Sequence, residues 1–173
     1  MNMDTLPDPE QLLEVLAQQL THALPAESKL IGIHSGGAWL AQRLAELLPA
    51  KPELGSIDVS FYRDDFSRVG LHSQIKKTHL PFEVEGANLL LVDDVLFTGR
   101  SVRAALNEIF DYGRPASVQL AVLIDRGGRE LPIEAQYAAA RLAVPRDQSI
   151  VLGKDAAGRL SLGLEPRKDR ADA

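Results

Sequence analysis

The chain has 173 residues, 45% of them hydrophobic, so we expect one globular domain, residues 1–173, with a sizeable buried core. It contains no cysteine, which excludes disulfides, thiolate metal sites and thiol catalysis. The formal net charge of −5 gives the molecule as a whole no attraction to nucleic acid. Because the sequence shows neither a signal-peptide pattern nor an apolar run that could span a bilayer, we expect a cytoplasmic protein without a membrane partner.

The first half of the chain is expected to alternate helices and strands. Leucines at helical spacing predict a helix over residues 9–24 and a second helix that ends at residue 48. Strands are expected over residues 29–34 and 57–62, which are apolar or alternate in the β pattern. Residues 63–86 are polar, without a clear apolar stripe, and are expected to form a flexible lid loop.

The second half continues the alternation and then changes character. The pattern predicts a strand, a helix and a strand, then a hairpin of two short strands: 88–92, 102–110, 118–124, 149–152 and 159–164. The last residues, 166–173, are charged and expected to fray. Strands that alternate with helices predict an α/β fold, in which helices flank an open parallel sheet.

The most informative stretch follows the third expected strand. Four apolar residues, 89–92, run into Asp93 and Asp94, and residues 95–101 then lead into a helix. Ligands of open parallel sheets sit beyond the carboxyl ends of the strands, where paired carboxylates bind ribose hydroxyls and favour a nearby Mg²⁺. Successive N–H groups at a helix start suit a phosphate. The pattern predicts a ligand such as phosphoribosyl pyrophosphate (PRPP).

The acidic pair is also compatible with two simpler arrangements. A solvated strand end followed by an ordinary helix cap gives the same residues. Phospho-acceptor receiver domains also place acids at a strand end, but the phosphate-type loop directly after Asp94 argues against that class. The sequence contains neither a G-x-x-x-x-G-K-[ST] nor a G-x-G-x-x-G phosphate motif.

Three blocks of sequence resemble a known family. Residues 89–101 look like the PRPP-binding motif of type I phosphoribosyltransferases. More narrowly, residues 61–65, 92–100 and 113–132 resemble PyrR, the pyrimidine operon regulator that is also a uracil phosphoribosyltransferase. The third block, Gly-Arg-Pro-Ala-Ser-Val-Gln-Leu-Ala-Val-Leu-Ile-Asp-Arg-Gly-Gly-Arg-Glu-Leu-Pro, is the most specific. The resemblance covers about residues 31–137 and implies the type I phosphoribosyltransferase fold with a small hood.

The resemblance implies that uracil and PRPP react to give UMP and pyrophosphate. Asp93 and Asp94 would hold the ribose hydroxyls, and Mg²⁺ would be held near them through the substrate, with no direct protein ligand. Arg126 would share in catalysis near the base. The other substrate-binding residues would be those of two turns and a phosphate loop: Ser35, Gly36, Gly37, Val95, Leu96, Phe97, Thr98, Gly99, Arg100 and Ser101.

Arg63 and the neighbouring pair Lys76 and Lys77 are expected to close over the pyrophosphate, and Arg63 is included among the substrate-binding residues. For the two lysines, a solvated loop tip is the alternative. Residues 138–146 fit the family poorly, so the rim of the base pocket is undefined from the sequence.

Two positions depart from patterns of related sequences. The pyrophosphate loop of PyrR normally reads Thr-Arg-Gly, and here Gly36 stands at the arginine position. Losing a guanidinium beside a leaving pyrophosphate costs on the order of a few kcal/mol of transition-state stabilisation, so Gly36→Arg is expected to raise the rate. Phe97 stands where purine and orotate relatives often carry an acid, but PyrR-type sequences have an aromatic residue there as well.

Three functions are compatible with the sequence. The first is a uracil phosphoribosyltransferase, and the second is a nucleotide-sensing regulator that binds a leader mRNA. The third is a catalytically weak sensor of PRPP or UMP, which the absence of a side chain at Gly36 motivates. The family also implies a homodimer or a higher homo-oligomer.

Overall fold

The computed structural model describes residues 6–60 and 78–168. In chain order the elements are α1 (Pro9–Ala23), β1 (Lys29–Ile33), α2 (Gly36–Leu47), β2 (Leu54–Ile57), β3 (Asn88–Leu96), α4 (Arg100–Tyr112), β4 (Ser117–Asp125), β5 (Tyr137–Arg141), β6 (Gln148–Lys154) and β7 (Leu160–Pro166). Within these residues a five-stranded sheet has the order β2-β1-β3-β4-β5, and every pairing in it is parallel. The predicted α/β class is therefore confirmed.

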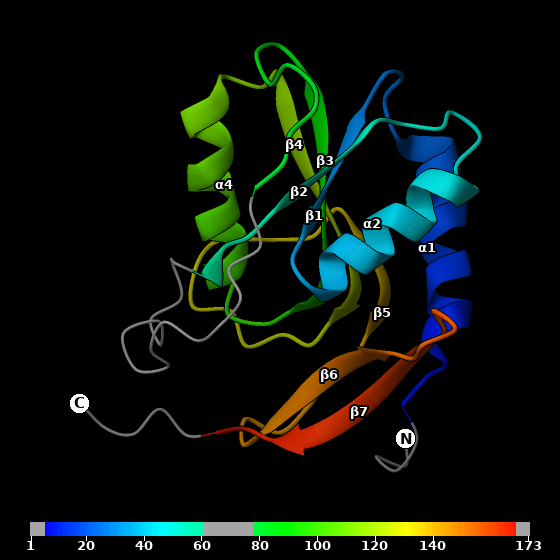
Figure 1. Cartoon of the computed structure of the whole chain (residues 1–173). Coiled ribbons are helices and arrows are strands. Elements are labelled where there is room, and N and C mark those ends of the chain that lie inside the picture. The colour runs from blue at the N-terminus through cyan, green and yellow to red at the C-terminus, as the bar shows by residue number, and fades with distance from the viewer. Residues whose placement is uncertain (1–5, 61–77, 169–173) are drawn as a thin grey trace.

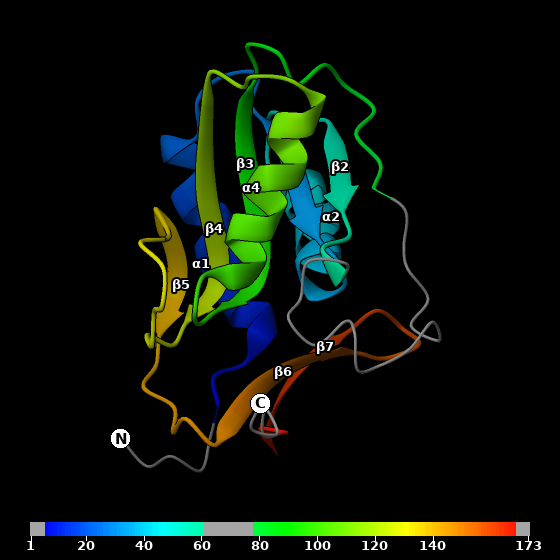
Figure 2. The same cartoon turned by 90° about the vertical axis from the view of Figure 1, so that its left-hand side faces the viewer.

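Helices cover both faces of the sheet. α1 and α2 lie on one face and α4 lies on the other (Figures 1 and 2). Neighbouring strand residues point alternately into the two layers, so Leu90 joins the core beneath α1 and α2, and Leu91 joins the core beneath α4. Both side chains are fully buried, which explains why β3 is apolar throughout its first half instead of alternating.

The antiparallel pair β6–β7 forms a separate hairpin, which confirms the expected terminal hairpin. It crosses beyond the carboxyl ends of the parallel strands, at the edge where ligands bind in this class of fold (Figure 2). Leu152 and Leu160 of the hairpin pack into the core beneath α1 and α2. The hairpin is thus fixed to the body by buried apolar contacts.

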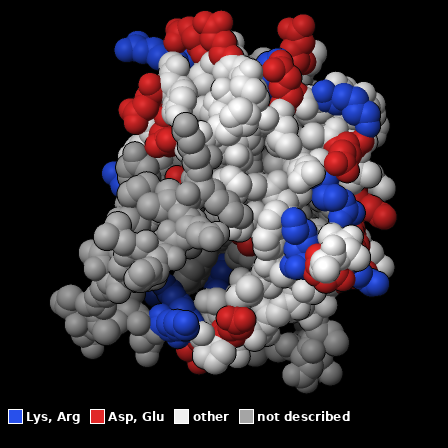
Figure 3. Space-filling view, viewed as in Figure 1, with Lys and Arg blue, Asp and Glu red and all other residues white. Residues whose placement is uncertain are grey.

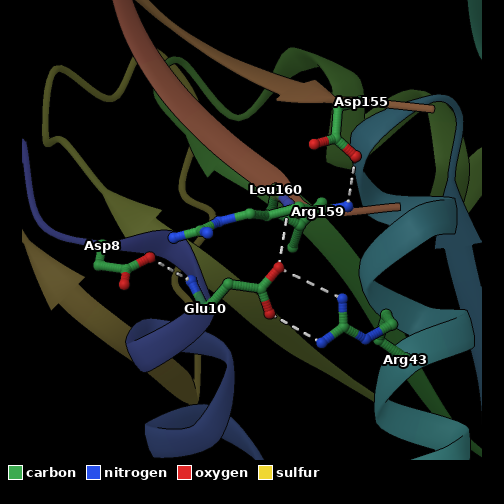
Figure 4. A network of polar contacts seen from close by, with 6 residues as sticks. All are labelled: Asp8, Glu10, Arg43, Asp155, Arg159 and Leu160. Carbon is green, nitrogen blue, oxygen red and sulfur yellow. Dashed lines mark hydrogen bonds and ion pairs between the residues drawn. The ribbon is translucent and has the colours of Figure 1, made fainter. Parts of the chain in front are cut away.

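A polar junction also ties the hairpin to both helices of that layer (Figure 4). Glu10 of α1 accepts a hydrogen bond from Arg43 Nη2 of α2 at 2.8 Å and from the Leu160 N–H of β7 at 2.9 Å. The hydrogen bond from Arg43, followed by that from Leu160, lowers the pKa of Glu10 below its ordinary value. One carboxylate therefore holds three elements together.

Two expectations about the elements need correction. β2 ends at Ile57, where the strand was expected to begin, because the Asp58 side chain accepts from the Ser60 N–H at 2.9 Å and turns the chain. Residues 78–86 are a loop without helix or strand, as expected, but they pack against the body with Val84 buried. Residues 63–77 lie outside the described residues. β5 was missed altogether. None of the described helices has the length and apolar character needed to cross a membrane.

Candidate active site

The acidic pair lies within β3 and not in a loop after it. β3 continues to Leu96, which pairs with Asp125 of β4, and Asp93 pairs with Val122. Only 8% of Asp93 is exposed, which does not fit the alternative of a fully solvated strand end, whereas Asp94 is partly exposed. Val95 and Leu96 were expected in the phosphate loop, but they are strand residues. The Val95 N–H is already bonded to Asp94 Oδ1 at 2.9 Å.

Each acid holds the backbone of the next residue. Asp93 Oδ1 accepts from the Asp94 N–H at 2.9 Å, in the same way that Asp94 holds Val95. These short-range bonds fix the direction of both side chains at the carboxyl end of the strand. The arrangement suits a preformed recognition site, because a carboxylate held by the protein has little freedom to lose when a ligand hydroxyl binds.

The loop after β3 starts a helix without a side-chain cap. Gly99, with φ of 91°, is the residue before α4 and, as a glycine, has no side chain to cap the helix. The Thr98 carbonyl accepts from the N–H groups of Glu130 and Leu131 at 3.0 and 3.2 Å, which anchors the loop. Thr98 Oγ1 accepts from the Arg100 N–H at 3.3 Å, and Ser101 lies in the first turn.

A second uncapped helix starts on the other side of the acidic pair. Ser35 precedes α2, and no side chain caps the first turn of this helix. The peptide bond between His34 and Ser35 is cis. A Cβ atom on Gly37 would lie 2.3 Å from the Val92 carbonyl oxygen, so the start of α2 is packed directly against the end of β3. The structure thus brings Ser35, Gly36 and Gly37 to the acidic pair, as expected.

The contact between Gly36 and Asp94 bears on the expected effect of Gly36→Arg. A Cβ atom on Gly36 would lie 2.4 Å from Asp94 Oδ2 and 2.8 Å from its Cγ, far inside normal contact distance. Any side chain at position 36 must therefore displace the Asp94 carboxylate or the turn. Gly36→Arg adds a cation, but it also disturbs one of the two acids, so we no longer expect it to raise the rate.

Arg126, which was expected to act in catalysis, is buried and donates to main-chain carbonyls. Its Nη1 donates to the Gln148 oxygen at 2.7 Å, and its Nη2 donates to the oxygens of Pro145 and Val144 at 2.8 and 3.2 Å. Burial, and then the charge of Arg167, lower the pKa of Arg126 from its ordinary value. These contacts hold the linker between β5 and β6 against β4, and a direct contact with substrate stays a prediction.

The neighbouring Arg129 is also an internal strut. It donates from Nη2 to Asp125 Oδ2 at 2.6 Å, from Nη1 to the Phe97 oxygen at 2.9 Å and from Nε to the Ile133 oxygen at 2.8 Å. Burial alone would raise the pKa of Asp125, but the hydrogen bonds from Arg129 and from the Gly127 N–H outweigh it and lower that pKa. The Asp-Arg-Gly-Gly-Arg block therefore braces the back of the phosphate loop.

One basic residue beside Phe97, Arg167, lies in the tail that was expected to fray and is not among the predicted site residues. The Arg167 N–H donates to the Asp147 oxygen at 2.6 Å, and its guanidinium carbon lies 4.9 Å from the centre of the Phe97 ring. No motif marks this residue in the sequence. Its place follows only from the path of β7, which returns the chain to the phosphate loop.

The donors of the acidic pair are of the kind that Mg²⁺ prefers. No group of three or more His, Asp or Glu side chains is arranged to hold a metal within residues 6–60 and 78–168. Asp93 and Asp94 offer hard carboxylate oxygens, the donors that Mg²⁺ prefers, beside the turn at Gly36. Arg63, Lys76 and Lys77 lie outside the described residues.

Comparisons with known proteins agree with this geometry. A family model described as "Phosphoribosyl transferase domain" matches residues 6–149. The chain is 49% identical over 152 residues to the bifunctional protein PyrR of Pseudomonas paraeruginosa, covering 86% of this chain and 89% of that protein. It is 50% identical over 167 residues to the bifunctional protein PyrR of Ralstonia nicotianae, covering 92% and 95%. The chain belongs to the PyrR family.

Solved structures support the fold of this PyrR family member. A hypoxanthine-guanine phosphoribosyltransferase from Bacillus anthracis superposes with a TM-score of 0.62 at 20% identity, covering 81% of this chain and 82% of that one. A hypoxanthine phosphoribosyltransferase from Staphylococcus aureus gives 0.64 at 21% identity, covering 82% and 78%. At such identities the likeness shows the fold alone, which is the predicted type I phosphoribosyltransferase fold.

Proposed function

We propose that this PyrR family member is a uracil phosphoribosyltransferase, which forms UMP and pyrophosphate from uracil and PRPP. One observation carries the proposal: two helices without side-chain caps, α2 and α4, start on either side of Asp93 and Asp94. A helix start binds anions through its free N–H groups and the positive end of its dipole. PRPP has a phosphate at each end of a ribose, and the site offers anion positions on both sides of a carboxylate pair.

The two ends of PRPP receive different positions in this proposal. The 5′-phosphate binds the start of α4, at Thr98, Gly99, Arg100 and Ser101, and the pyrophosphate binds the start of α2, at Ser35, Gly36 and Gly37. Asp93 and Asp94 accept hydrogen bonds from the ribose hydroxyls between them. Uracil N1 then attacks the anomeric carbon as the bond to pyrophosphate breaks, and the donors at α2 stabilise the charge that develops on the leaving group.

Mg²⁺ would be bound mainly through PRPP, close to Asp93 and Asp94. When bound, it neutralises charge on the pyrophosphate as that group leaves. The contribution of this chain is the fixed direction of the two carboxylates, each set by the hydrogen bond from the following N–H. Arg126 has a positioning role. It lies over the Phe97 ring and holds the start of β6 by a hydrogen bond.

The direct test is UMP formation by the purified protein from uracil, PRPP and Mg²⁺, with pyrophosphate measured in the same sample. The control is Asp93→Asn combined with Asp94→Asn, which keeps the size of both side chains. We expect equal amounts of UMP and pyrophosphate from the native protein, and a rate at least about 100-fold lower from the double variant. No UMP above background from the native protein would contradict the proposal.

A second candidate function, regulation of pyrimidine genes through a leader mRNA, is compatible with the first. It is favoured by the name "bifunctional" that the curated relatives carry. Binding that depends on UMP and weakens steeply with salt would support it. The same family membership favours a homodimer or a higher homo-oligomer and action in the cytoplasm, and the oligomer is tested by the mass of the protein in solution.

A further inference from the structure

Two arginines share one aromatic ring beside the phosphate loop. The guanidinium carbon of Arg126 lies 4.0 Å from the centre of the Phe97 ring, and that of Arg167 lies 4.9 Å from it. Because both guanidinium carbons lie close to the same ring centre, the two positive groups are near each other. A cation gains from contact with a ring face, but two cations at one ring repel each other. An electron-rich group bound beside the ring would reduce this repulsion.

The two arginines differ in what their donors do. Arg126 is buried and directs three hydrogen bonds at carbonyls, and its Nε is buried without a hydrogen-bond partner. Arg167 is partly exposed, and within the described residues its side chain makes no ion pair and no hydrogen bond. Arginine has five N–H donors and no acceptor. Arg167 is thus the one of the two whose donors are available to a ligand.

The position of this group within the site narrows the ligand. In the sheet order, β1 lies on one side of β3 and β4 on the other. The α2 turn meets Asp94 on the β1 side, whereas the Phe97 ring lies over the turn that follows β4, where a Cβ atom on Gly128 would be 2.4 Å from the ring. If pyrophosphate takes the β1 side and the 5′-phosphate takes the start of α4, the β4 side is left for the base.

The molecular surface has positively charged side chains in and around a hollow beside the hairpin. Figure 3 shows a hollow between the body and the hairpin, with blue Lys or Arg atoms both at its lower rim and deeper inside. A group that enters this hollow therefore meets donors of positive charge.

We propose that Arg167 is a specificity residue of this site, and that it donates a hydrogen bond to the 4-oxo group of the pyrimidine. The inference rests on the proposed function. Uracil has a carbonyl acceptor at C4. Cytosine has an amino group there, and this donor would face the N–H donors of Arg167, which has no acceptor. A site built to donate rejects such an analogue, because both donors are left unpaired. Phe97 and Arg126 place the Arg167 guanidinium.

Calorimetric binding of UMP, CMP and ribose 5-phosphate tests this role without needing turnover. The variants are Arg167→Met, which keeps an unbranched apolar chain, and Arg167→Lys, which keeps the charge. Lys168→Met is the matched control, since Lys168 is the next residue and exposed. We expect Arg167→Met to weaken UMP binding about tenfold, to leave CMP and ribose 5-phosphate unchanged, and so to collapse the preference for UMP. The UMP affinity of Arg167→Lys should lie between those of Arg167→Met and the native protein, and that of Lys168→Met should match the native protein.

Three results would overturn the inference. Equal weakening of UMP and ribose 5-phosphate would show that Arg167 serves the phosphate and not the base. Unchanged UMP affinity in a folded Arg167→Met protein, checked by its melting temperature, would show that Arg167 does not touch the ligand. Failure of the native protein to bind both UMP and ribose 5-phosphate would remove the proposed function itself, and with it this inference.

Discussion

The start of α1 and the starts of α2 and α4 are built in opposite ways. At α1, the Asp8 side chain accepts from the Glu10 N–H at 3.0 Å, a proline fills the first turn and an acid follows it. At α2 and α4, no side chain caps the helix and no acid lies in the first turn. At α1 the residue before the helix satisfies a first-turn N–H group, whereas Ser35 and Gly99 do not do so at α2 and α4. At α4, the residue before Gly99 bonds one such group, since Thr98 Oγ1 accepts from the Arg100 N–H at 3.3 Å.

The difference agrees with the proposed PRPP site, because a side-chain cap would occupy N–H groups that are proposed to bind its phosphates. A side-chain cap stabilises a helix by roughly 1 kcal/mol, so two missing caps are a measurable loss. Both gaps lie at the carboxyl edge of the sheet, on either side of β3, and neither lies at the far edge. Substitutions at the three helix starts and at the Glu10 junction test this difference between the capped and uncapped helices.

The largest effect is expected from a side chain at the α2 turn. Gly36→Ala places a Cβ atom against the Asp94 carboxylate, so we expect UMP formation to fall about 100-fold, with Gly36→Arg no better. Steady-state kinetics with PRPP as the varied substrate measures it. Gly163→Ala is the matched control, because a Cβ atom there meets nothing within 4 Å, and it should leave the rate unchanged. A faster Gly36→Arg enzyme would contradict the packing argument.

A side-chain cap introduced at the start of α2 should make this helix start like that of α1. Ser35→Asp puts a carboxylate at the residue before the helix, where it satisfies the first-turn N–H groups and repels anions. We expect pyrophosphate affinity to fall about tenfold or more by calorimetry, without loss of thermal stability. Ser35→Ala removes the hydroxyl without adding charge and should lose far less. Equal losses from the two variants would place the effect in the hydroxyl and not in the helix start.

The junction at Glu10 should contribute stability that depends on pH. Because the pKa of Glu10 is lowered in the folded protein, its stabilisation is present above its ordinary pKa of about 4.5 and is lost as the pH falls through the lower folded value. At neutral pH, Glu10→Gln should cost roughly 1 kcal/mol in urea unfolding, and the difference should shrink in acid. Glu14→Gln, at an exposed position of the same helix, should behave like the native protein at every pH.

The smallest effect is expected at the cap of α1. Asp8→Ala removes the acceptor for the Glu10 N–H and should lower the free energy of unfolding by about 0.5–1 kcal/mol. Affinities for pyrophosphate and ribose 5-phosphate should not change, since Asp8 is not among the residues of the proposed PRPP site. A change in either affinity would show that the capped and uncapped helices are coupled.

The sequence predicted the parts of the fold whose residues act locally. Leucines at helical spacing and the apolar run of β3 predicted helices and strands correctly, because each pattern matches a single buried face or a strand covered on both sides. β5 was missed because Ala138, Ala139 and Ala140 have little β propensity, and their strand exists only through pairing with β4. β2 was misplaced because the turn at Asp58 depends on one side-chain bond.

The candidate site was predictable to a similar degree. The motif at Asp93 and Asp94 and the turn at Gly36 are local, and the structure brings them together as expected. The contact between Gly36 and Asp94, the carbonyl contacts of Arg126 and the approach of Arg167 to Phe97 join segments far apart in the chain. No spacing rule encodes such contacts, so the sequence alone could not anticipate what surrounds Gly36 and Arg126 or that Arg167 lies beside Phe97.

The most direct test of the central claim is to bind the two halves of PRPP separately and together. Calorimetry in the presence of Mg²⁺ measures pyrophosphate and ribose 5-phosphate, each alone, then each with the other at saturation, and finally each with PRPP. The two helix starts predict that each half competes with PRPP while both halves bind one protein at once. Mutual exclusion of the two halves, or no binding of PRPP, would contradict the account.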